Sequence, residues 1–500
     1  PIMLRSNVCS TNLLNKNALR AAGECEYDQG GYFLIDGKEK VIVAQERQIE
    51  NKLYTNVKPK DPRYKIISEI RSAPEDKFQP ARITKTVLLR EKKQKDKVII
   101  EDNIIRVIIP QINGEVPLLV VYRALGIVSD YDILNTMVDL SDKNKYTQII
   151  LDFLRPSIIE GSIISNTQDA LEYLSYKISR NFLKDSSEKE RLDFTLEILR
   201  NHFLPHSGTN LLDKAYFLSH MVKEVFEVNN NLRPSTDRDS FLYKRVDLSG
   251  FLISSIFRDL YFRVKNKMIE ILNVGYSKAQ TSANIDTSKV INYWVDKNSD
   301  GEYNIINFIK ENNEGILDIK NIIDRSIMDD GFMYAFKNCW GLKDAPCKEG
   351  IVQDINRISY LGFISHLRRI NTPLSSSAKV RAPHSLHGSS WGIMCPSETP
   401  DGANIGVRKN LSTISSISFG TNSRALEQLL FTSKVMDIKQ IDPNKNKGTK
   451  VFLNERLVGY TFEPNYLFNK LKIHKRNALI NIYTSIAWYK SENIIKLSTD

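Results

Sequence analysis

Cysteine is scarce in this sequence, and what little there is does not cluster. The 500 residues contain Cys9, Cys25, Cys339, Cys347 and Cys395. Cysteines that are few, odd in number and widely scattered favour a reducing compartment over a disulfide framework. Cys339 and Cys347 stand too far apart for a zinc knuckle, and no second pair accompanies them. The sequence therefore predicts no zinc site.

Long apolar runs, internal repeats and low-complexity tracts are also missing. No stretch approaches the roughly 18 unbroken apolar residues of a membrane span, so none is predicted. Acidic residues are outnumbered, with 59 Asp and Glu against 70 Lys and Arg, which gives a net charge of +11. Such a surplus favours a polyanionic partner without indicating a fold. A chain of 500 residues exceeds one hydrophobic core, and we expect three or four structural units.

Strand patterns dominate the first 122 residues. Residues 32–35 and 40–43 flank Asp36-Gly37, a strong hairpin-turn signal. Residues 82–87 alternate polar with apolar side chains, as in a half-buried strand. A second hairpin is predicted from 104–109, through Asn113-Gly114, to a strand at 118–121.

The middle of the chain, about 125–275, reads as helical. Helices are predicted over 168–182, 192–203 and 247–267, the last with Leu252, Ile256 and Leu260 facing inward. Residues 340–417 are rich in Gly, Pro, Ser and Thr and predict ordered loops. Short strands such as 450–453 and a helix near 466–472 follow. The predicted fold class is α+β and multidomain, with mixed sheets and helices.

The loop-rich stretch 357–410 carries seven basic residues against two acidic ones, Glu398 and Asp401. Basic groups on glycine- and serine-rich loops can reach phosphates. The alternative is a solvated loop with incidental charge, and composition alone leaves the two open.

Two metal-like patterns are interpreted as decoys. Residues 296–301 imitate the start of an EF-hand, but the twelfth position is Asn307 rather than a bidentate glutamate, so an exposed Asp-Gly turn is preferred. His366, His384 and His387 gather without the spacing of a metal site. For His387 we expect packing near Trp391 or a hydrogen bond.

Two long motifs in the same region carry a family resemblance. Residues 365–373 (SHLRRINTP) resemble the SHLRR-x-NTP signature of the second-largest, β-type subunits of multisubunit DNA-directed RNA polymerases from eukaryotes, archaea and large DNA viruses. Residues 386–402 are similar to that family's LHxSxWGxxCPxETPEG. Further matching stretches lie at 1–6, 30–47, 122–130, 168–173, 204–218, 237–250 and 451–454.

The resemblance implies a fragment with a defined domain order. Residues 1–48 and 253–340 would form the protrusion, 49–252 the lobe, 341–417 the fork and 418–500 part of an external domain. The zinc-bearing clamp and the two-lysine active-site segment would lie downstream. Mg²⁺ would be held mainly by the largest, β′-type subunit, so the fragment would bind no cofactor and would not be catalytic alone.

By the same resemblance the fork separates downstream duplex from the RNA–DNA hybrid. The residues expected nearest nucleic acid are Arg357, Arg368, Arg369, Arg381 and His384, with Arg258 and Lys265 as further candidates. The residues expected to shape the loops are Asn371, Thr372, Pro373, Glu398, Thr399 and Pro400. His384 stands where the family usually has arginine, and Asp401 where it has glutamate. Neighbouring residues of a helix point about 100° apart, so one of Arg368 and Arg369 should face phosphate and the other brace a carboxylate, with Glu398 the nearest candidate.

The implied partners are the largest subunit, smaller polymerase subunits, template DNA, product RNA and nucleoside triphosphates, with no membrane. The implied location is inside the cell: the nucleus for a cellular eukaryotic protein, the host cytoplasm or virion for a viral one. Frequent Asn, Ile and Lys favour an AT-rich genome and a large DNA virus as source. Two alternatives stay open. One is a non-catalytic nucleic-acid-binding scaffold that retains the fold. The other, a single-chain two-barrel polymerase, would need a DxDGD-like cluster that the sequence lacks.

Overall fold

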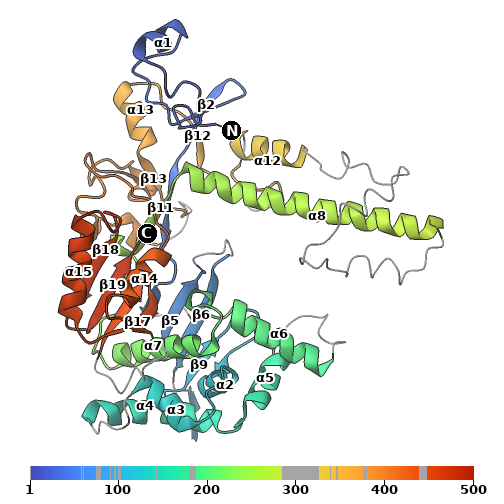
Figure 1. The fold of residues 1–500 in the computed structure, drawn as a ribbon, viewed down its shortest axis with the longest axis vertical. Helices are drawn as coiled ribbons and strands as arrows, with labels where there is room; N and C mark the ends of the chain where they lie inside the picture. The colour runs from blue at the N-terminus through green and yellow to red at the C-terminus, as the bar shows by residue number, and fades with distance from the viewer. Residues whose placement is uncertain are drawn as a thin grey trace. The chain divides into compact units, whose positions relative to one another are not determined.

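The chain folds into two compact units, each built from segments that are distant in sequence. The computed structural model describes residues 2–57, 59, 61–74, 80–90, 92–94, 97–99, 103–138, 140, 144–178, 187–283, 326–337, 339–344, 347–374, 380–437 and 448–499. The first unit comprises Pro1–Arg47 and Lys244–Ser416, and the second comprises Gln48–Tyr243 and Ile417–Asp500 (Figure 1). The α+β, multidomain class expected from the sequence is confirmed.

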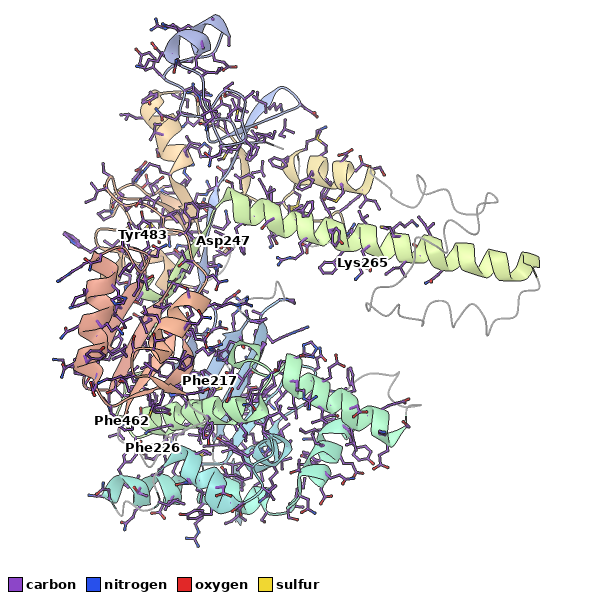
Figure 2. All side chains as sticks on the ribbon, in the orientation of Figure 1. Phe217, Phe226, Asp247, Lys265, Phe462 and Tyr483 are labelled. Carbon is purple, nitrogen blue, oxygen red and sulfur yellow. A yellow bond between two sulfur atoms is a disulfide. The ribbon has the colours of Figure 1, made fainter. Side chains whose placement is uncertain are left out.

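The second unit contains an antiparallel sheet of order β10-β9-β6-β5-β4. Its strands are β4 (Leu53–Asn56), β5 (Tyr64–Ser72), β6 (Arg82–Leu89), β9 (Ile105–Ile108) and β10 (Val116–Pro117). The helices around it are α2 (Leu118–Ala124), α3 (Asp130–Met137), α4 (Lys145–Gly161), α5 (Thr167–Tyr176), α6 (Glu188–Asn201) and α7 (Leu211–Asn229). α7 packs across β4, β5 and β6, and its Phe217 and Phe226 are almost fully buried (Figure 2).

A second sheet in this unit has the order β15-β17-β16-β19-β18. Its strands are β15 (Met436–Asp437), β16 (Thr449–Leu453), β17 (Arg456–Thr461), β18 (Ser485–Tyr489) and β19 (Ile494–Ser498), with helices α14 (Arg424–Phe431) and α15 (Pro464–Arg476). The smaller elements of the unit are β7 (Lys92–Gln94), β8 (Lys97–Ile99), η2 (Pro205–Ser207) and η3 (Phe241–Tyr243). The predicted strand at 450–453 and helix near 466–472 are confirmed by β16 and α15.

The first unit is built on two small sheets, β1-β2-β12 and β11-β3-β13-β14. Their strands are β1 (Phe33–Ile35), β2 (Lys38–Ile42), β3 (Ala44–Gln48), β11 (Lys244–Asp247), β12 (Val352–Asp354), β13 (Arg369–Asn371) and β14 (Arg408–Asn410). The helices are α1 (Lys16–Ala21), α8 (Ser249–Ala283), α12 (Ser326–Lys337) and α13 (Tyr360–Leu367), with short turns η4 (Ala382–His384), η5 (Gly388–Ser390) and η6 (Gly402–Asn404). The stretch predicted as ordered loops therefore consists of short elements and turns.

The hairpin predicted around Asp36-Gly37 is confirmed, since β1 and β2 pair antiparallel from Ile35 opposite Lys38. Asp36 and Gly37 take φ values of 48° and 72°, the left-handed pair that a two-residue hairpin turn requires. The predicted inward face of α8 is also confirmed, because Leu252, Ile256 and Leu260 are buried.

One expected strand was wrong: residues 118–121 form helix α2. Every residue of α2 is buried, so its apolar run carries neither the period of a strand nor that of a surface helix. The preceding β9 and β10 do pair, with Val116 opposite Val107. Pro117 then occupies the N-cap of the helix.

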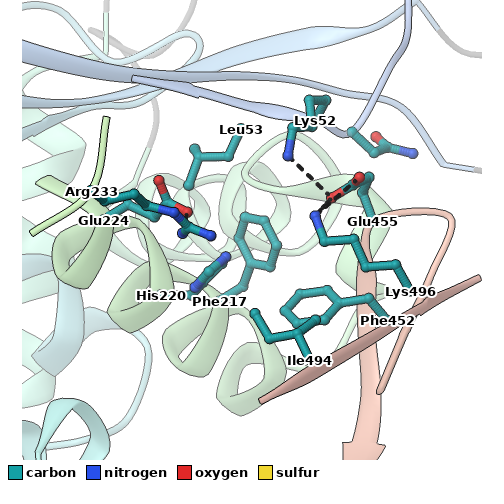
Figure 3. A pocket seen from close by; sticks show the side chains of 11 residues that line it. Lys52, Leu53, Phe217, His220, Glu224, Arg233, Phe452, Glu455, Ile494 and Lys496 are labelled. Carbon is teal, nitrogen blue, oxygen red and sulfur yellow. Dashed lines mark hydrogen bonds and ion pairs between the residues drawn. The ribbon is translucent and has the colours of Figure 1, made fainter. Parts of the chain in front are cut away.

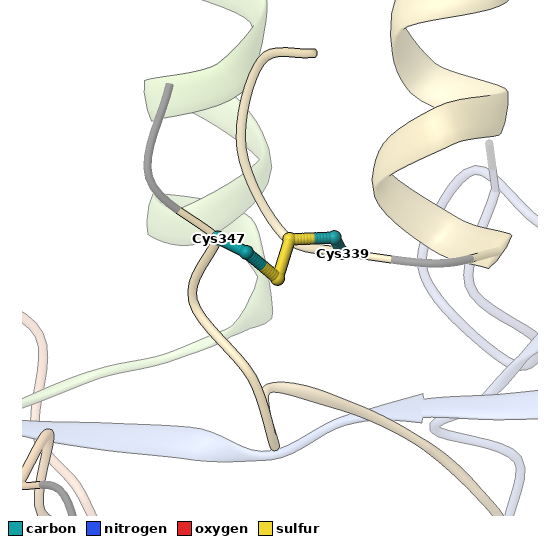
Figure 4. The surroundings of a disulfide bond; sticks show 2 residues. All are labelled: Cys339 and Cys347. Atoms are coloured by element: carbon teal, nitrogen blue, oxygen red, sulfur yellow. A yellow bond between two sulfur atoms is a disulfide. The ribbon is translucent and has the colours of Figure 1, made fainter. Parts of the chain in front are cut away.

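Cys339 and Cys347 form a disulfide in the first unit, with Cα atoms 5.4 Å apart (Figure 4). It closes a short loop between α12 and β12, beside an isolated bridge from Trp340 to Lys348. One cross-link is not a disulfide framework, but scattered spacing gave no signal for this pair. Cys9, Cys25 and Cys395 are free.

Across the described ranges, no helix combines the length and the apolar character needed to cross a bilayer.

Candidate nucleic-acid interface

Residues 341–417, which the sequence resemblance assigns to the fork and which are called the fork segment below, contribute β13 and β14 to the sheet β11-β3-β13-β14. Ile370 at the centre of β13 is fully buried and pairs in parallel with Ala44 of β3. The buried carboxylate of Glu46 lies 2.8 Å from the ammonium nitrogen of Lys244 and 2.5 Å from that of Lys409. These two ion pairs join the outer strands to β3, so Lys409 acts as an internal brace.

Arg357 is held by carboxylates. Its guanidinium donates to both Glu39 oxygens at 2.8 and 3.0 Å and to Asp28 at 3.3 Å. The guanidinium carbon also lies 4.4 Å from the ring centroid of Phe363. The hydrogen bond to Glu39 is the main reason that the pKa of Arg357 is raised. Because the positive charge of Arg357 is shared between two carboxylates, it retains little net attraction for a phosphate.

Arg368 and Arg369 differ in surroundings although they are adjacent. Arg368 follows α13 and donates to the carbonyl oxygens of Ser412 at 2.6 Å and Ser415 at 3.3 Å. It therefore pins the end of the fork segment to the chain that follows α13. Carbonyls, rather than the carboxylate of Glu398 expected from the sequence, receive this guanidinium.

Arg369 is half-buried at the start of β13. Burial lowers its pKa, as does the neighbouring guanidinium of Arg408, while Glu398 acts in the opposite direction. Among the residues that the structure describes, the Arg369 guanidinium donates no hydrogen bond and forms no ion pair. Of the two adjacent arginines, Arg369 is thus the one with open donors.

Arg381 and His384 lie around the turn η4. Arg381 is exposed at its N-cap. The Nδ1 of His384 lies 2.8 Å from the carbonyl of Ile405, and since a carbonyl only accepts, Nδ1 carries the proton. The backbone is tight here: Gly406 has φ 69°, and a Cβ on it would lie 2.8 Å from the Pro383 carbonyl. His384 is therefore fixed, with Nε2 as its remaining polar atom.

Several residues expected to shape the loops make backbone contacts. Asn371 donates to the Gly350 carbonyl at 3.0 Å, and the Thr372 amide donates to Val407 at 2.9 Å. Thr399 Oγ1 donates to the Arg408 carbonyl and accepts from the Gly406 amide, both at 2.9 Å.

Glu398 is held through its side chain and its backbone. Ser365 donates to its carboxylate, and Asn410 donates to its carbonyl at 3.0 Å. Pro373 is exposed and Pro400 half-buried, and no specific contact distinguishes either of them among the described residues.

The remaining histidines of the segment are used in hydrogen bonds. His366 accepts from the Asn356 amide through Nδ1 at 3.1 Å and donates to Gln353 through Nε2 at 2.9 Å. Burial lowers the pKa of His366 to about 4. His387 Nδ1 accepts from the Ser389 amide at 3.2 Å, which confirms a hydrogen-bonding role; Trp391 is 91% exposed.

No three His, Cys, Asp or Glu side chains in the described part of the chain gather closely enough to hold a metal ion. The EF-hand-like stretch 296–301 lies outside the described residues.

The two outlying candidates lie on α8. Arg258 is half-buried, and Lys265 is exposed near the middle of this helix (Figure 2). Arg263, between them, pairs with Asp344 at 3.1 Å. α8 thus presents cations, but they are spread along its length rather than gathered.

A dense set of partly buried charges in the second unit was missed from the sequence. Glu455 lies 3.7 Å from Lys52 and 3.1 Å from Lys496, and Arg233 pairs with Glu224 (Figure 3). Arg233 also pairs with Glu492. Except for Glu492, these side chains line a cavity of about 10 Å³ together with Phe217, His220 and Phe452. Burial is the main reason that the pKa of His220 lies well below its usual value. Two of the pairs, Glu455 with Lys52 and Arg233 with Glu492, join residues that are far apart in the sequence, and no local pattern signals them.

Comparison with known proteins identifies the class to which this fold and its motifs belong. The family described as RNA polymerase beta subunit matches residues 1–293, and the family described as RNA polymerase Rpb2, domain 3, matches residues 353–417. The chain therefore belongs to the RNA polymerase beta subunit family, as its motifs implied.

Individual relatives agree with this membership. The DNA-directed RNA polymerase II subunit RPB2 of Encephalitozoon cuniculi is 32% identical over 100% of this chain and 40% of that protein. The DNA-directed RNA polymerase II subunit 2 of Arabidopsis thaliana is 30% identical over 96% and 37%, respectively. The DNA-directed RNA polymerase subunit Rpo2 of Saccharolobus solfataricus is 27% identical over 96% and 38%. The chain thus spans about two fifths of the length of these relatives.

Proposed function

We propose that this chain is part of a subunit of a DNA-directed RNA polymerase and guides template, downstream DNA and the RNA–DNA hybrid during transcription. Family membership gives the enzyme class. The observation that carries the guiding role is the division of labour in the fork segment: Arg357, Arg368 and Lys409 are bound internally, whereas Arg369 and Arg381 keep open donors. Nothing among the described residues favours a scaffold that has lost the polymerase.

The chemistry belongs to the assembled enzyme. Magnesium would be supplied by a site on the largest subunit, where it would stabilise the charge developing on the transferred phosphate. The contribution of this chain is to hold phosphodiester groups by charge and hydrogen bonding, irrespective of base. The partners are then the largest and smaller polymerase subunits, DNA, RNA and nucleoside triphosphates, inside a cell or virion. The names protrusion, lobe, fork and external domain are part of this proposal.

The breaks between the two units support the domain names in part. They fall at 47/48, 243/244 and 416/417, close to three of the four predicted boundaries. The fourth, near 340, lies within the first unit and has no corresponding break.

The test compares Arg368→Ala with Arg369→Ala in the complete polymerase. Removing Arg369 should shorten the lifetime of elongation complexes on every template. It should also reduce the slope of log lifetime against log salt concentration by about the contribution of one phosphate contact. Removing Arg368 should mainly destabilise the fork segment, by about 1–3 kcal/mol, because it leaves carbonyls unpaired. A loss confined to particular template bases, or equal salt slopes in both variants, would contradict the proposal.

A further inference from the structure

The two-stranded ladder β13–β14 presents two opposite faces with different charge balance. Residues that alternate along a strand share a face, and directly paired residues share it too. Arg369 pairs with Asn410, and Asn371 pairs with Arg408, so these four side chains lie on one face. Ile370 and Lys409 lie on the other.

Cations on the second face are neutralised. Lys409 reaches the buried carboxylate of Glu46 at 2.5 Å, and Ile370 fills the core. That face therefore has a structural role, and the charge of Lys409 is paired.

The first face has an excess of positive charge. Arg369 and Arg408 are diagonal neighbours, a relation that places Cα atoms about 7–8 Å apart and lets long side chains meet. Their proximity is also felt electrostatically, because Arg408 lowers the pKa of Arg369. Both are half-buried, and among the described residues neither guanidinium has a hydrogen-bond or ion-pair partner. One carboxylate, Glu398, is close enough to act on Arg369, and it already accepts from Ser365.

The side chains beneath the pair are fixed. Asn371 and Asn410 are 8% and 4% exposed, and each donates to a backbone carbonyl, of Gly350 and Glu398 respectively. Thr399 holds the Arg408 carbonyl at 2.9 Å. The asparagines beneath the two arginines and the backbone of Arg408 are thus held by hydrogen bonds. The two guanidinium groups, in contrast, repel each other and carry open donors.

We propose that Arg369 and Arg408 together form a binding site for one phosphoryl group. A phosphate presents several acceptor oxygens in the geometry that guanidinium donors match, and its negative charge would replace the repulsion between the arginines with two attractions. The group comes from the nucleic-acid backbone or from a nucleoside triphosphate. The inference rests on the proposed function and adds Arg408, which no motif indicated, as the second half of the site.

The experiment uses the complete polymerase with Arg408→Gln, Arg369→Gln, the double variant and Arg408→Lys. Arg20→Gln, which removes the same charge from a side chain that is 65% exposed and paired with Glu26 in the same unit, is the control. Elongation-complex lifetime over a salt series reports on backbone phosphate, and the KM for nucleoside triphosphates reports on the substrate. Thermal unfolding without nucleic acid reports on structure.

Either single glutamine variant should lower the lifetime or raise the KM, and the double variant should lose little more than the worse single one, because both arginines hold one group. A fourfold rise in salt weakens a single phosphate contact about 3.5-fold. If the group is backbone phosphate, the glutamine variants should therefore be about 3.5-fold less sensitive to such a rise than the parent enzyme. Arg408→Lys should keep the salt slope but not the full affinity, since lysine lacks the fork. The unfolding temperature of Arg408→Gln should stay level or rise because a repulsion is removed.

Other results would overturn the inference. If Arg369→Gln is impaired while Arg408→Gln behaves like Arg20→Gln, the two-arginine site is wrong and the proposed function stands. Fully additive losses would mean two separate contacts. A fall in the unfolding temperature of Arg408→Gln without nucleic acid would make Arg408 a structural brace. If Arg369→Gln and Arg381→Gln are also unimpaired, the guiding role itself fails.

Discussion

Positive charge has two kinds of surroundings in this chain, and the paired network of the second unit contrasts with the Arg369–Arg408 pair of the fork segment. In the second unit, Lys52, Lys496 and Arg233 are largely buried and matched by Glu455, Glu224 and Glu492. In the fork segment, Arg369 and Arg408 stand together with one carboxylate nearby. A buried charge must be paired to be tolerated, whereas an unpaired charge is free for a ligand. The surplus of +11 is therefore less informative than the surroundings of each cation.

The comparison is sharpest at Lys214, a buried cation whose partners are carbonyls. This fully buried ammonium donates to Leu199, Arg200 and Phe203 at 2.8, 2.6 and 2.5 Å, at the C-terminal end of α6. Burial lowers its pKa to about 7. Lys214→Met should cost about 4 kcal/mol of unfolding free energy, because several buried carbonyls lose their donor. Urea unfolding of the complete subunit measures it, with Lys189→Met on the exposed side of α6 as control. A loss under 1 kcal/mol would mean that the carbonyls find other donors.

Breaking the paired network should cost somewhat less. Glu455→Gln leaves Lys52 and Lys496 without their shared carboxylate, while their side chains remain only 12% and 25% exposed. We expect a loss of about 3 kcal/mol, at the low end for a buried pair because some solvent reaches it. The control is Glu463→Gln, which removes an exposed pair with Lys434 and should cost less than about 1 kcal/mol. Equal losses in the two variants would show that burial does not distinguish these pairs.

Acid should weaken the second unit through its neutral histidines. Burial, followed by the charges of Lys214 and Arg456, lowers the pKa of His206 from 6.5 to about 3. A depressed folded pKa gives stability that is complete above the unfolded pKa, near 6.5, and is lost as pH falls toward 3. At pH 5 the loss from His206 should be about 2 kcal/mol. His206→Gln should flatten the unfolding profile between pH 6.5 and 4 relative to His474→Gln. A profile as steep as that of the parent would assign the acid sensitivity elsewhere.

Local sequence patterns predicted helices and strands well where one face of the element is buried and the other is exposed to solvent. The turn at Asp36-Gly37 and the stripe of Leu252, Ile256 and Leu260 were predicted because turn residues and helical periodicity can be recognised within a short stretch of sequence. Residues 118–121 were assigned to the wrong element because a segment buried on every side has no period.

The candidate site divides in the same way. Motifs pointed to the fork arginines, but which of them are spent on internal partners depends on pairings made by the fold. Arg357 meets Glu39, and Lys409 meets Glu46, each more than 300 residues away. Arg408 joins Arg369 only through the register of β13 and β14. No spacing in the sequence encodes those distances. The disulfide of Cys339 with Cys347 was missed for a different reason: the two cysteines are only eight residues apart, but few and scattered cysteines indicated a reducing compartment.

The smallest expected effect is at Arg381, which tests the unpaired side of the comparison alone. Arg381 is exposed at the N-cap of η4, and no described residue accepts from its guanidinium. Arg381→Gln should therefore leave the unfolding free energy unchanged within about 0.5 kcal/mol, as expected for a surface position. In the complete polymerase, a fourfold rise in salt should shorten the lifetime of the Arg381→Gln complex about 3.5-fold less than that of the parent complex, because one phosphate contact is lost. Arg63→Gln removes a guanidinium that is 63% exposed beside Asp61 and leaves Glu115 paired with Arg106, so it is the matched control and should change neither quantity. A stability loss in Arg381→Gln with an unaltered salt slope would show that an exposed cation of the fork segment is structural, and the division between paired and unpaired charge would then fail at its simplest case.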